Sequence, residues 1–282
     1  MAVDPPLAGG TAAQVPARED TLIVSLTSYP PKIPTLHLAL ETLLRQSLKP
    51  DALILWLAEE EFPGRENDLP HAVLALRDQG LSIRWTTNTR SYKKLVPALR
   101  EYPESVIVTA DDDALYSPEW LERLYADYRT QERKTMVYAH RVHRITVYEN
   151  GTIYPYGLWS HAEHNEPGES FFNFATGVGG ILYPPGALHS DVCDESLFLR
   201  LAPYADDIWF WAMALLNGSF IRVVENFIAP IKNVPLAKGV AAGTLYEYNS
   251  RGGNDEQFEN VMRQYPDIAI KLLTELKILR RR

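Results

Sequence analysis

The stretch ESVIVTADDDALYSPEWLERLY, residues 104–125, joins a strand, an acidic triplet and a helix. A run of β-formers leads directly into Asp111, Asp112 and Asp113, and the pattern of an amphipathic helix follows. Carboxylates packed side by side repel one another. A buried strand that ends in three of them therefore predicts a positively charged partner at this place.

The same alternation of strand and helix continues on the N-terminal side of this stretch. Continuous apolar runs predict strands at 21–30, 51–59, 81–88 and 105–113, and helical periodicity predicts helices at 35–47, 68–80, 92–103 and 117–131. Continuous apolar strands that alternate with helices favour a parallel sheet covered on both faces. We therefore predict an α/β fold with a mostly parallel, Rossmann-like sheet.

Polar residues follow each of the four predicted strands. Ligands of such sheets bind beyond the carboxyl ends of the strands. The acidic triplet therefore falls on the edge where a ligand would bind. The other strand ends carry Thr27-Ser28-Tyr29, Glu59-Glu60-Glu61 and Thr87-Asn88.

The pattern changes after residue 132 and predicts a smaller mixed region. Asn150-Gly151 is a strong hairpin turn signal between two strands. A helix over 206–218 begins at an acidic pair, and a glycine-rich segment precedes it. A last strand at 221–226 and a terminal helix from 258 complete the pattern.

Composition excludes some functional classes. The formal net charge of −8 over 282 residues argues against binding to the negatively charged backbone of nucleic acid. Cys193 is the only cysteine, so no intramolecular disulfide can form, and no apolar run reaches the ~18 residues of a membrane span. We expect a cytoplasmic protein. The three arginines at 280–282 leave two readings open, a solvated helix end or a peripheral contact with anionic lipid at the inner face of the membrane.

Three readings of the acidic triplet compete. Extra acids at a helix start are disfavoured because Ser117 and Pro118 offer a better start a few residues later. A phosphatase-like Asp-x-Asp site would usually follow the first strand rather than the fourth. The third reading is a Mg²⁺ or Mn²⁺ site for a nucleoside diphosphate, on which Asp111 and Asp113 converge while Asp112 points away.

Five ordered motifs carry a family resemblance between residues 22 and 218. The chain resembles nucleotide-sugar-dependent glycosyltransferases of the GT-A fold, close to the family-2-type enzymes of bacterial capsule and surface polysaccharide synthesis. An isolated Asp-x-Asp is weak evidence for this family, but the ordered set of five motifs is strong evidence. The motifs are VSLTSYPPKI, SYKKLVPAL, VTADDDALYSPEWL, TGVGGILYPPGAL and ADDIWFWAMALLNG.

The resemblance implies a donor site at the carboxyl edge of the sheet. Asp111 would bind the ribose side and, with Asp113, the metal that bridges the diphosphate. The implied cofactors are Mn²⁺ or Mg²⁺ and a nucleotide-sugar donor, with a UDP-sugar favoured. The remaining nucleotide-binding residues would be Thr27, Ser28, Tyr29, Asn88, Lys93, Lys94 and Asp112. For the two lysines, a solvated helix face is the alternative.

The ADDIW motif resembles the acidic motif that supplies the general base of inverting members. Asp207 would take the proton of the acceptor hydroxyl, and Asp206 would cap or orient. One departure concerns the metal, because many such enzymes have a histidine downstream of the base and none follows Asp207 here. Asn233 or Asn249 could supply an oxygen instead.

The resemblance predicts a metal-dependent glycosyltransferase that acts on a glycan or lipid-linked acceptor, with inversion. A sugar-phosphate nucleotidyltransferase is the alternative, but its glycine-rich loop after the first strand is missing from LTSYPPKIP. An inactive carbohydrate-binding relative is the other. The expected organisation is a flexible tail over 1–20 and one domain over 21–282, with a nucleotide-binding half (21–131), an acceptor half (132–235) and a lid loop with the C-terminal helix (236–282). The oligomeric state stays open.

Overall fold

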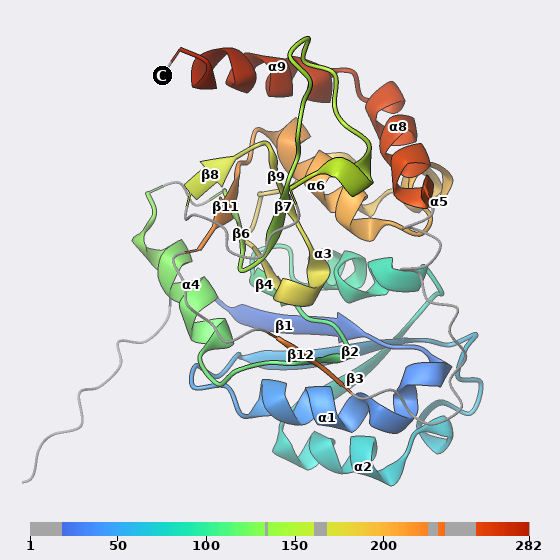
Figure 1. Cartoon of the computed structure of the whole chain (residues 1–282). Coiled ribbons are helices and arrows are strands. Elements are labelled where there is room, and N and C mark those ends of the chain that lie inside the picture. The colour runs from blue at the N-terminus through green and yellow to red at the C-terminus, as the bar shows by residue number, and fades with distance from the viewer. Residues whose placement is uncertain (1–18, 133–134, 161–167, 225–230, 235–251, 282) are drawn as a thin grey trace, which may run out of the picture.

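A central sheet of eight strands organises the molecule (Figure 1), which we describe from a computed structural model. The structure describes residues 19–132, 135–160, 168–224, 231–234 and 252–281. The sheet has the order β3-β2-β1-β4-β10-β6-β11-β8. Its strands are β1 (Leu22–Thr27), β2 (Ala52–Ala58), β3 (Leu81–Thr86), β4 (Val106–Thr109), β6 (Val137–Ala139), β8 (Gly168–Ser170), β10 (Ile181–Tyr183) and β11 (Ile221–Val223).

Most strands of this sheet point in one direction. β1 pairs in parallel with β2 and β4, and β2 pairs in parallel with β3. β10 is antiparallel to both β4 and β6, and β11 is parallel to β6 but antiparallel to β8. Only β10 and β8 therefore run against the other strands of the sheet. The predicted α/β fold with a mostly parallel sheet is confirmed.

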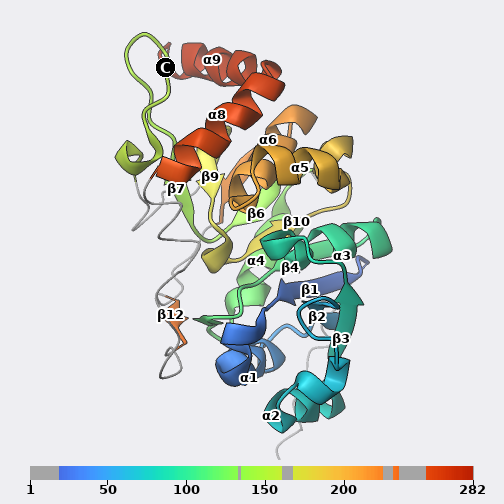
Figure 2. The ribbon, with the colours of Figure 1, turned by 90° about the vertical axis from the view of Figure 1, so that its right-hand side faces the viewer.

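Helices cover both faces of the sheet, as the continuous apolar strands require. In β1, Ile23 belongs to one apolar core and its neighbours Leu22 and Val24 belong to the other. Figure 1 shows α1 and α2 below the sheet and α3 and α6 above it, and Figure 2 shows α8 and α9 beyond α6. The helices are α1 (Ile33–Leu44), α2 (His71–Leu74), α3 (Val96–Glu101), α4 (Trp120–Thr130), α5 (Glu195–Leu201), α6 (Asp206–Asn217), α8 (Asn254–Gln264) and α9 (Asp267–Leu279).

Prolines and 3₁₀ turns explain where the helices differ from the predicted ones. The segment 92–103 divides into the 3₁₀ helix η4 (Arg90–Lys94) and α3, which starts with a proline in its first turn. The predicted terminal helix is two helices, α8 and α9, because Pro266 interrupts it. The helix predicted from Ser117 begins at Trp120, and the Ser117 hydroxyl has no hydrogen-bond partner in the described part of the chain.

The second half contains short strands rather than one long hairpin. Asn150-Gly151 forms the predicted turn, with Gly151 at φ 88° and a single bridge between Val147 and Ile153. β7 (Val142–Arg144) pairs with β9 (Asn173–Ala175), and β5 (Ala114–Leu115) pairs with β12 (Lys232–Asn233).

Several expectations fall wholly or largely on residues outside the described ranges. These are the flexible tail, the lid loop over 236–255 and Asn249. The division of the chain into halves at residues 131 and 235 stays a prediction.

Candidate active site

The acidic triplet lies in a turn after β4, at the carboxyl end of the parallel strands. Two of its aspartates bind residues that follow β1. Ser28 Oγ donates a hydrogen bond to Asp112 Oδ2 at 2.5 Å, and Lys32 Nζ donates to Asp113 Oδ2 at 2.9 Å. The loop after β1 and the turn after β4 therefore form one wall of the site, as the parallel pairing of β1 and β4 requires.

The third aspartate binds a different cation. Lys94 Nζ donates to Asp111 Oδ1 at 3.2 Å and lies 3.0 Å from Asp206 Oδ2. Lys94 is buried, so a single ammonium links the end of β4 to the first turn of α6. Asp111, Lys94 and Asp206, which come from three separate motifs of the sequence, meet here.

Asp111 and Asp113 reach different lysines, whereas the sequence suggested that they converge while Asp112 points away. The reason is local geometry. Convergence of alternate residues needs an extended chain, but β4 ends at Thr109 and residues 112–113 lie in a turn. Asp112 instead faces Ser28.

Buried contacts on both sides hold η4, the 3₁₀ helix that carries Lys94. Ser25, in the middle of β1, donates its hydroxyl to the Lys94 carbonyl at 2.6 Å and accepts from the Trp56 indole at 3.0 Å. On the other side, the Tyr92 hydroxyl donates to the Ala202 carbonyl at 2.6 Å, and its ring stacks on Phe198. These contacts fix the backbone from which Lys94 extends.

A glycine loop closes the site over Lys94 and the second acid of α6. The Gly177 N–H donates to Asp207 Oδ2 at 3.2 Å, whereas Asp207 Oδ1 is buried and has no partner among the described residues. A Cβ at Gly177 would lie 2.7 Å from Lys94 Nζ. A side chain at this position would therefore displace the Lys94 ammonium from its present place.

Trp120 anchors the other end of the glycine loop. Its indole N–H donates to the Gly179 carbonyl at 2.8 Å, and Gly180 has φ 83°. A Cβ at Gly180 would lie 2.3 Å from the Trp120 ring. The sequence left a plain tight turn as the alternative for these glycines, but close approach to other side chains constrains them too.

Burial raises the pKa of several carboxyl groups in the site. It raises the pKa of Asp112 and of Asp207 to about 7 in each case, and it raises the pKa of Asp111 as well. Burial opposes the charge on Lys94, but Asp111 and Asp206 outweigh it and hold the lysine pKa well above its usual value. Lys94 therefore stays an ammonium. The carboxylates around it outnumber the positively charged groups that could balance them.

The charge balance leaves room for a cation. Seven charged side chains form the cluster between the acidic triplet and the start of α6, and the carboxylates outnumber the ammonium groups. The carboxylates are Asp111, Asp112, Asp113, Asp206 and Asp207, and the ammonium groups are Lys32 and Lys94. Carboxylate oxygens are the ligands that Mg²⁺ and Mn²⁺ prefer.

The residues present fit a metal held only partly by protein. Within the described ranges, no three His, Cys, Asp or Glu side chains are arranged to hold one. Mg²⁺ typically keeps waters and substrate phosphates in its shell, so a few protein oxygens suffice. Asn233, suggested from the sequence, pairs with Ala114, and the neighbouring Val234 N–H donates to the Asp113 carbonyl at 2.7 Å.

Lys93 does not lie on a solvated helix face. It is buried, and its Nζ lies 2.6 Å from Glu61 Oε2, beyond the end of β2. Tyr29 is 39% exposed. Partial burial raises the pKa of its hydroxyl, and the charges of Lys32, Asp112 and Glu61 also act on it. The structure therefore gathers Lys93 and Tyr29 beside the acidic triplet, and their contact with a nucleotide stays a prediction.

Thr27 and Asn88 have local roles in the structure. Thr27 Oγ1 donates to the Trp56 carbonyl of β2 at 2.8 Å, and Asn88 Oδ1 accepts the Arg90 N–H at 3.1 Å. Both side chains therefore shape strand ends. Their predicted place in the nucleotide pocket is not tested by these contacts.

Sequence reasoning did not single out three residues of the site. Lys32 and Glu61 carry the counter-charges of Asp113 and Lys93, and the Tyr116 hydroxyl accepts the Asp111 N–H at 2.8 Å. Lys32 and Tyr116 do lie inside the motifs quoted above, and Glu61 lies at a polar strand end. A search for charges of opposite sign at neighbouring strand ends could have found the pairs.

Replacing Lys94 by methionine is expected to lower the free energy of unfolding by about 3–5 kcal/mol, since it leaves buried carboxylates without their counter-charge. Urea denaturation of both proteins measures this. Lys32→Met is the matched control, because its partner Asp113 is 42% exposed and such pairs contribute about 0–1 kcal/mol. Equal losses in the two variants would contradict the assigned role of Lys94.

No family model matches the sequence, and no curated protein matches it either. Among solved structures, the chain is similar to TarS of S. aureus in complex with UDP, with 14% identity, a TM-score of 0.45, and coverage of 72% of this chain and 57% of that one. It is similar to a mannosyltransferase from Pyrobaculum calidifontis in complex with GDP-Man and Mn²⁺, with 18% identity, a TM-score of 0.35, and coverage of 44% and 36%. The chain thus spans well under two thirds of both.

A nucleotidyltransferase is also among the similar structures. The inositol-1-phosphate CTP transferase of T. maritima has 12% identity, a TM-score of 0.43, and coverage of 86% of this chain and 95% of that one. A mannosyltransferase and a CTP transferase are thus both among the similar solved structures. The function has to be argued from the site.

Proposed function

We propose that this protein is a glycosyltransferase that moves a sugar from a nucleotide-sugar to a hydroxyl group of a glycan or lipid-linked acceptor, with inversion and with a divalent metal. One observation carries the proposal. Asp207, a carboxylate with an unpartnered oxygen, lies at the start of α6 in the same charge cluster as the acidic triplet after β4. The cluster thus combines a candidate base with a candidate cation site.

Asp207 is suited to act as the general base. Burial raises its pKa to about 7, close to the pH at which a base is both unprotonated and able to take a proton. The Gly177 N–H fixes one carboxylate oxygen and leaves the other free. In the proposed step, the acceptor hydroxyl gives its proton to Asp207, and its oxygen attacks the sugar carbon opposite the departing diphosphate.

Asp206 and Lys94 would act as positioning residues. Lys94 forms ion pairs with both Asp206 and Asp111, and so fixes the start of α6 relative to the end of β4. Asp206 is therefore committed to an ion pair while Asp207 is not. This difference supports Asp207 as the base and Asp206 as the orienting residue.

The cation would be held by Asp113 and Asp111, with Asn233 nearby. The side chain of Asp113 is 42% exposed and that of Asp111 is 25% exposed, so Asp113 is the more accessible of the two to a cation from solvent. A divalent cation bound there would neutralise the charge that develops on the leaving diphosphate. Its remaining ligands would come from the substrate and water.

A sugar-phosphate nucleotidyltransferase is the second candidate, because an inositol-1-phosphate CTP transferase is among the similar structures. In such an enzyme the sugar phosphate attacks a nucleoside triphosphate. The loop after the first strand then needs positive charge to bind the triphosphate. In this chain the lysine of that loop, Lys32, is already paired with Asp113. Release of pyrophosphate from a nucleoside triphosphate and a sugar phosphate would favour this alternative, and release of a nucleoside diphosphate would favour ours.

For its place in the cell, we propose the cytoplasm with a peripheral contact at the inner face of the membrane. In the described part of the chain, none of the helices has the length and apolar character to cross a bilayer. A lipid-linked acceptor would then be reached from the membrane surface.

A thermal-shift screen of nucleoside diphosphates tests the donor site. A nucleotide at a hundredfold excess over its dissociation constant stabilises the native state by ~2.7 kcal/mol, so we expect a clear rise in Tm with UDP plus Mn²⁺ and a smaller one with GDP or CDP. The rise should depend on the metal. A shift with GDP or CDP alone would overturn the choice of base. No shift with any nucleotide would remove the proposed donor site.

A further inference from the structure

Helix α9 packs through one face on the second half of the molecule, among the residues that the structure describes. Ile268 and Leu272 are buried against the second half of the molecule. Glu275 accepts hydrogen bonds from Ser170 Oγ at 2.6 Å and from the Phe171 N–H at 2.8 Å. These contacts fix the rotation of α9 and therefore fix which residues face outward.

The outward side of α9 carries exposed apolar side chains among polar and basic ones. Ile270 is 61% exposed, Leu273 is 41% exposed and Ile278 is 50% exposed. Ile270 and Leu273, three residues apart, lie on one side of the helix, and Ile278 lies about 80° around the helix from Ile270. Single exposed apolar residues need no explanation, but a contiguous set of them marks an interaction surface.

Basic residues accompany this apolar face. Lys277 and Arg281 are exposed, and the described chain contains no acid after Glu275. The whole chain carries a net charge of −8. The C-terminal end of α9 is therefore a positively charged region on an acidic protein, which is the charge complement of an anionic surface.

The turn at 148–152 extends the same surface. Arg280 Nη2 donates to the Glu149 carbonyl at 3.0 Å, which ties the turn to the end of α9. Tyr148 is 41% exposed and stacks on Tyr154 with ring centroids 3.7 Å apart. A tyrosine has an apolar ring and a polar tip and suits the boundary between lipid and water.

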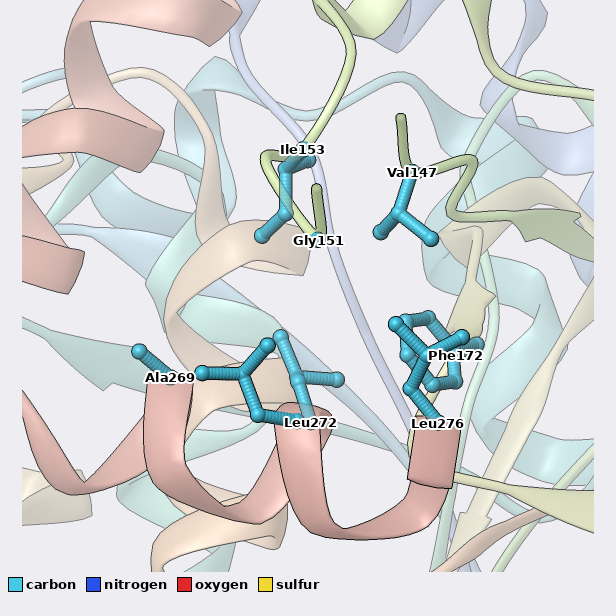
Figure 3. A pocket seen from close by; sticks show the side chains of 8 residues that line it. Val147, Gly151, Ile153, Phe172, Ala269, Leu272 and Leu276 are labelled. Carbon is cyan, nitrogen blue, oxygen red and sulfur yellow. The ribbon is translucent and has the colours of Figure 1, made fainter. Parts of the chain in front are cut away.

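A small apolar groove of about 60 Å³ lies between the turn and α9 (Figure 3). Val147, Gly151 and Ile153 face Leu272 and Leu276 across it, and Leu273 lines it as well. Because Leu273 is also on the outward face, the groove opens onto the exposed stripe of α9. It offers an apolar space next to the basic residues.

We propose that the outward face of α9, with the turn at 148–152, is a docking surface for a bilayer of anionic phospholipid. The apolar side chains would enter the boundary between headgroups and acyl chains, and Lys277 and Arg281 would meet the phosphate groups. A second copy of this chain is disfavoured as the occupant, because a symmetric contact would bring these cations together. The inference rests on α9 and the turn at 148–152, and it holds whether or not the proposed transfer reaction is correct.

Co-sedimentation with vesicles tests the surface, with the full chain added to phosphatidylcholine vesicles with and without phosphatidylglycerol. We expect binding only to the anionic vesicles and a decline as salt is raised. Each basic residue near such a surface contributes about 1 kcal/mol, so K277E/R281E should weaken binding by at least about 20-fold. Leu273→Glu should weaken it too, because it places a charge in the apolar face. Arg77→Glu, at another exposed site, is the matched control and should bind as wild type.

The outcomes separate the possible occupants. Unchanged circular dichroism and an unchanged Tm show that a variant is folded. Equal binding by wild type and K277E/R281E, or no binding by wild type to anionic vesicles, would overturn the proposal. A concentration-dependent dimer that Leu273→Glu abolishes would assign the face to a second copy instead.

Discussion

Asp207→Asn is expected to lower turnover by about 10²–10⁴-fold while nucleotide affinity and metal dependence are kept. The amide cannot take the proton of the acceptor hydroxyl, but it can still accept the Gly177 N–H that positions this side chain. The measurement is kcat with a saturating donor, together with the Kd for the nucleoside diphosphate. A change in Kd as large as the change in kcat would assign Asp207 to donor binding instead.

The pH dependence gives a second reading of the same residue. A general base works only when it has lost its proton. Because burial raises the pKa of Asp207 to about 7, kcat/KM should fall as the pH drops through that value. An unburied aspartate, with a pKa of about 3.9, would keep the rate constant down to far lower pH.

The variant should not be inactive because it is unfolded. A carboxyl whose pKa is raised by folding costs stability at every pH above its unfolded pKa, since folding disfavours its charged form. Asparagine carries no charge and removes this cost. Asp207→Asn should therefore be at least as stable as wild type at neutral pH, as thermal unfolding would reveal.

Asp206→Asn is the matched control, one residue away in the same helical turn. It removes the ion pair with Lys94 but leaves the Asp207 carboxylate in place. Turnover should fall less than in Asp207→Asn. If Asp206→Asn is the more damaging change, the roles of the two acids are reversed. If neither matters, the base lies elsewhere or the enzyme retains configuration.

The sheet could be predicted because both of its faces are covered. Ile23 and Val24 are adjacent in β1 and belong to opposite cores, so the strand shows no polar alternation and reads as one apolar run. The acidic triplet could be recognised as a candidate site because it directly follows such an apolar run. The α6 acids stood out for the same reason, because an apolar helix follows them directly.

The partners within the site could not be predicted, because they depend on tertiary contacts. Lys94 reaches Asp206, which is far away in the sequence, and no local pattern fixes that distance. Lys32 follows two prolines and looks like a solvated loop residue, yet it pairs with Asp113. The expected convergence of Asp111 and Asp113 assumed an extended chain, whereas the chain turns after β4 and the two acids pair with different lysines. Their joint binding of a cation stays a prediction.

Gly177 shows the same limit of local reasoning. A glycine-rich segment predicts a tight turn or a close approach but not the group that approaches. Here Lys94 Nζ would lie 2.7 Å from a Cβ at Gly177, and the glycine N–H binds Asp207. The need for glycine therefore comes from a side chain on η4, which the sequence of the loop cannot reveal.

Asp113→Ala is expected to abolish the gain in nucleotide affinity that Mn²⁺ provides. Asp113 would supply a ligand to the metal, and loss even of a group that only supports a ligand typically costs 10–100-fold in metal affinity. Its side chain is 42% exposed and makes one ion pair, to Lys32, so the fold should lose only about 0–1 kcal/mol. Calorimetric titration of UDP with and without Mn²⁺ measures the effect.

Glu60→Ala is the matched control, an exposed acid beyond the end of β2. It removes the same charge from the same edge of the sheet, so a general electrostatic effect on an anionic nucleotide would appear in both variants. A loss of Mn²⁺ dependence in Asp113→Ala alone locates the cation at the acidic triplet. If Asp113→Ala keeps the full gain from Mn²⁺, the cation is not held by Asp113. The base at Asp207 would then have to be judged by its own pH profile, because the two assignments fail independently.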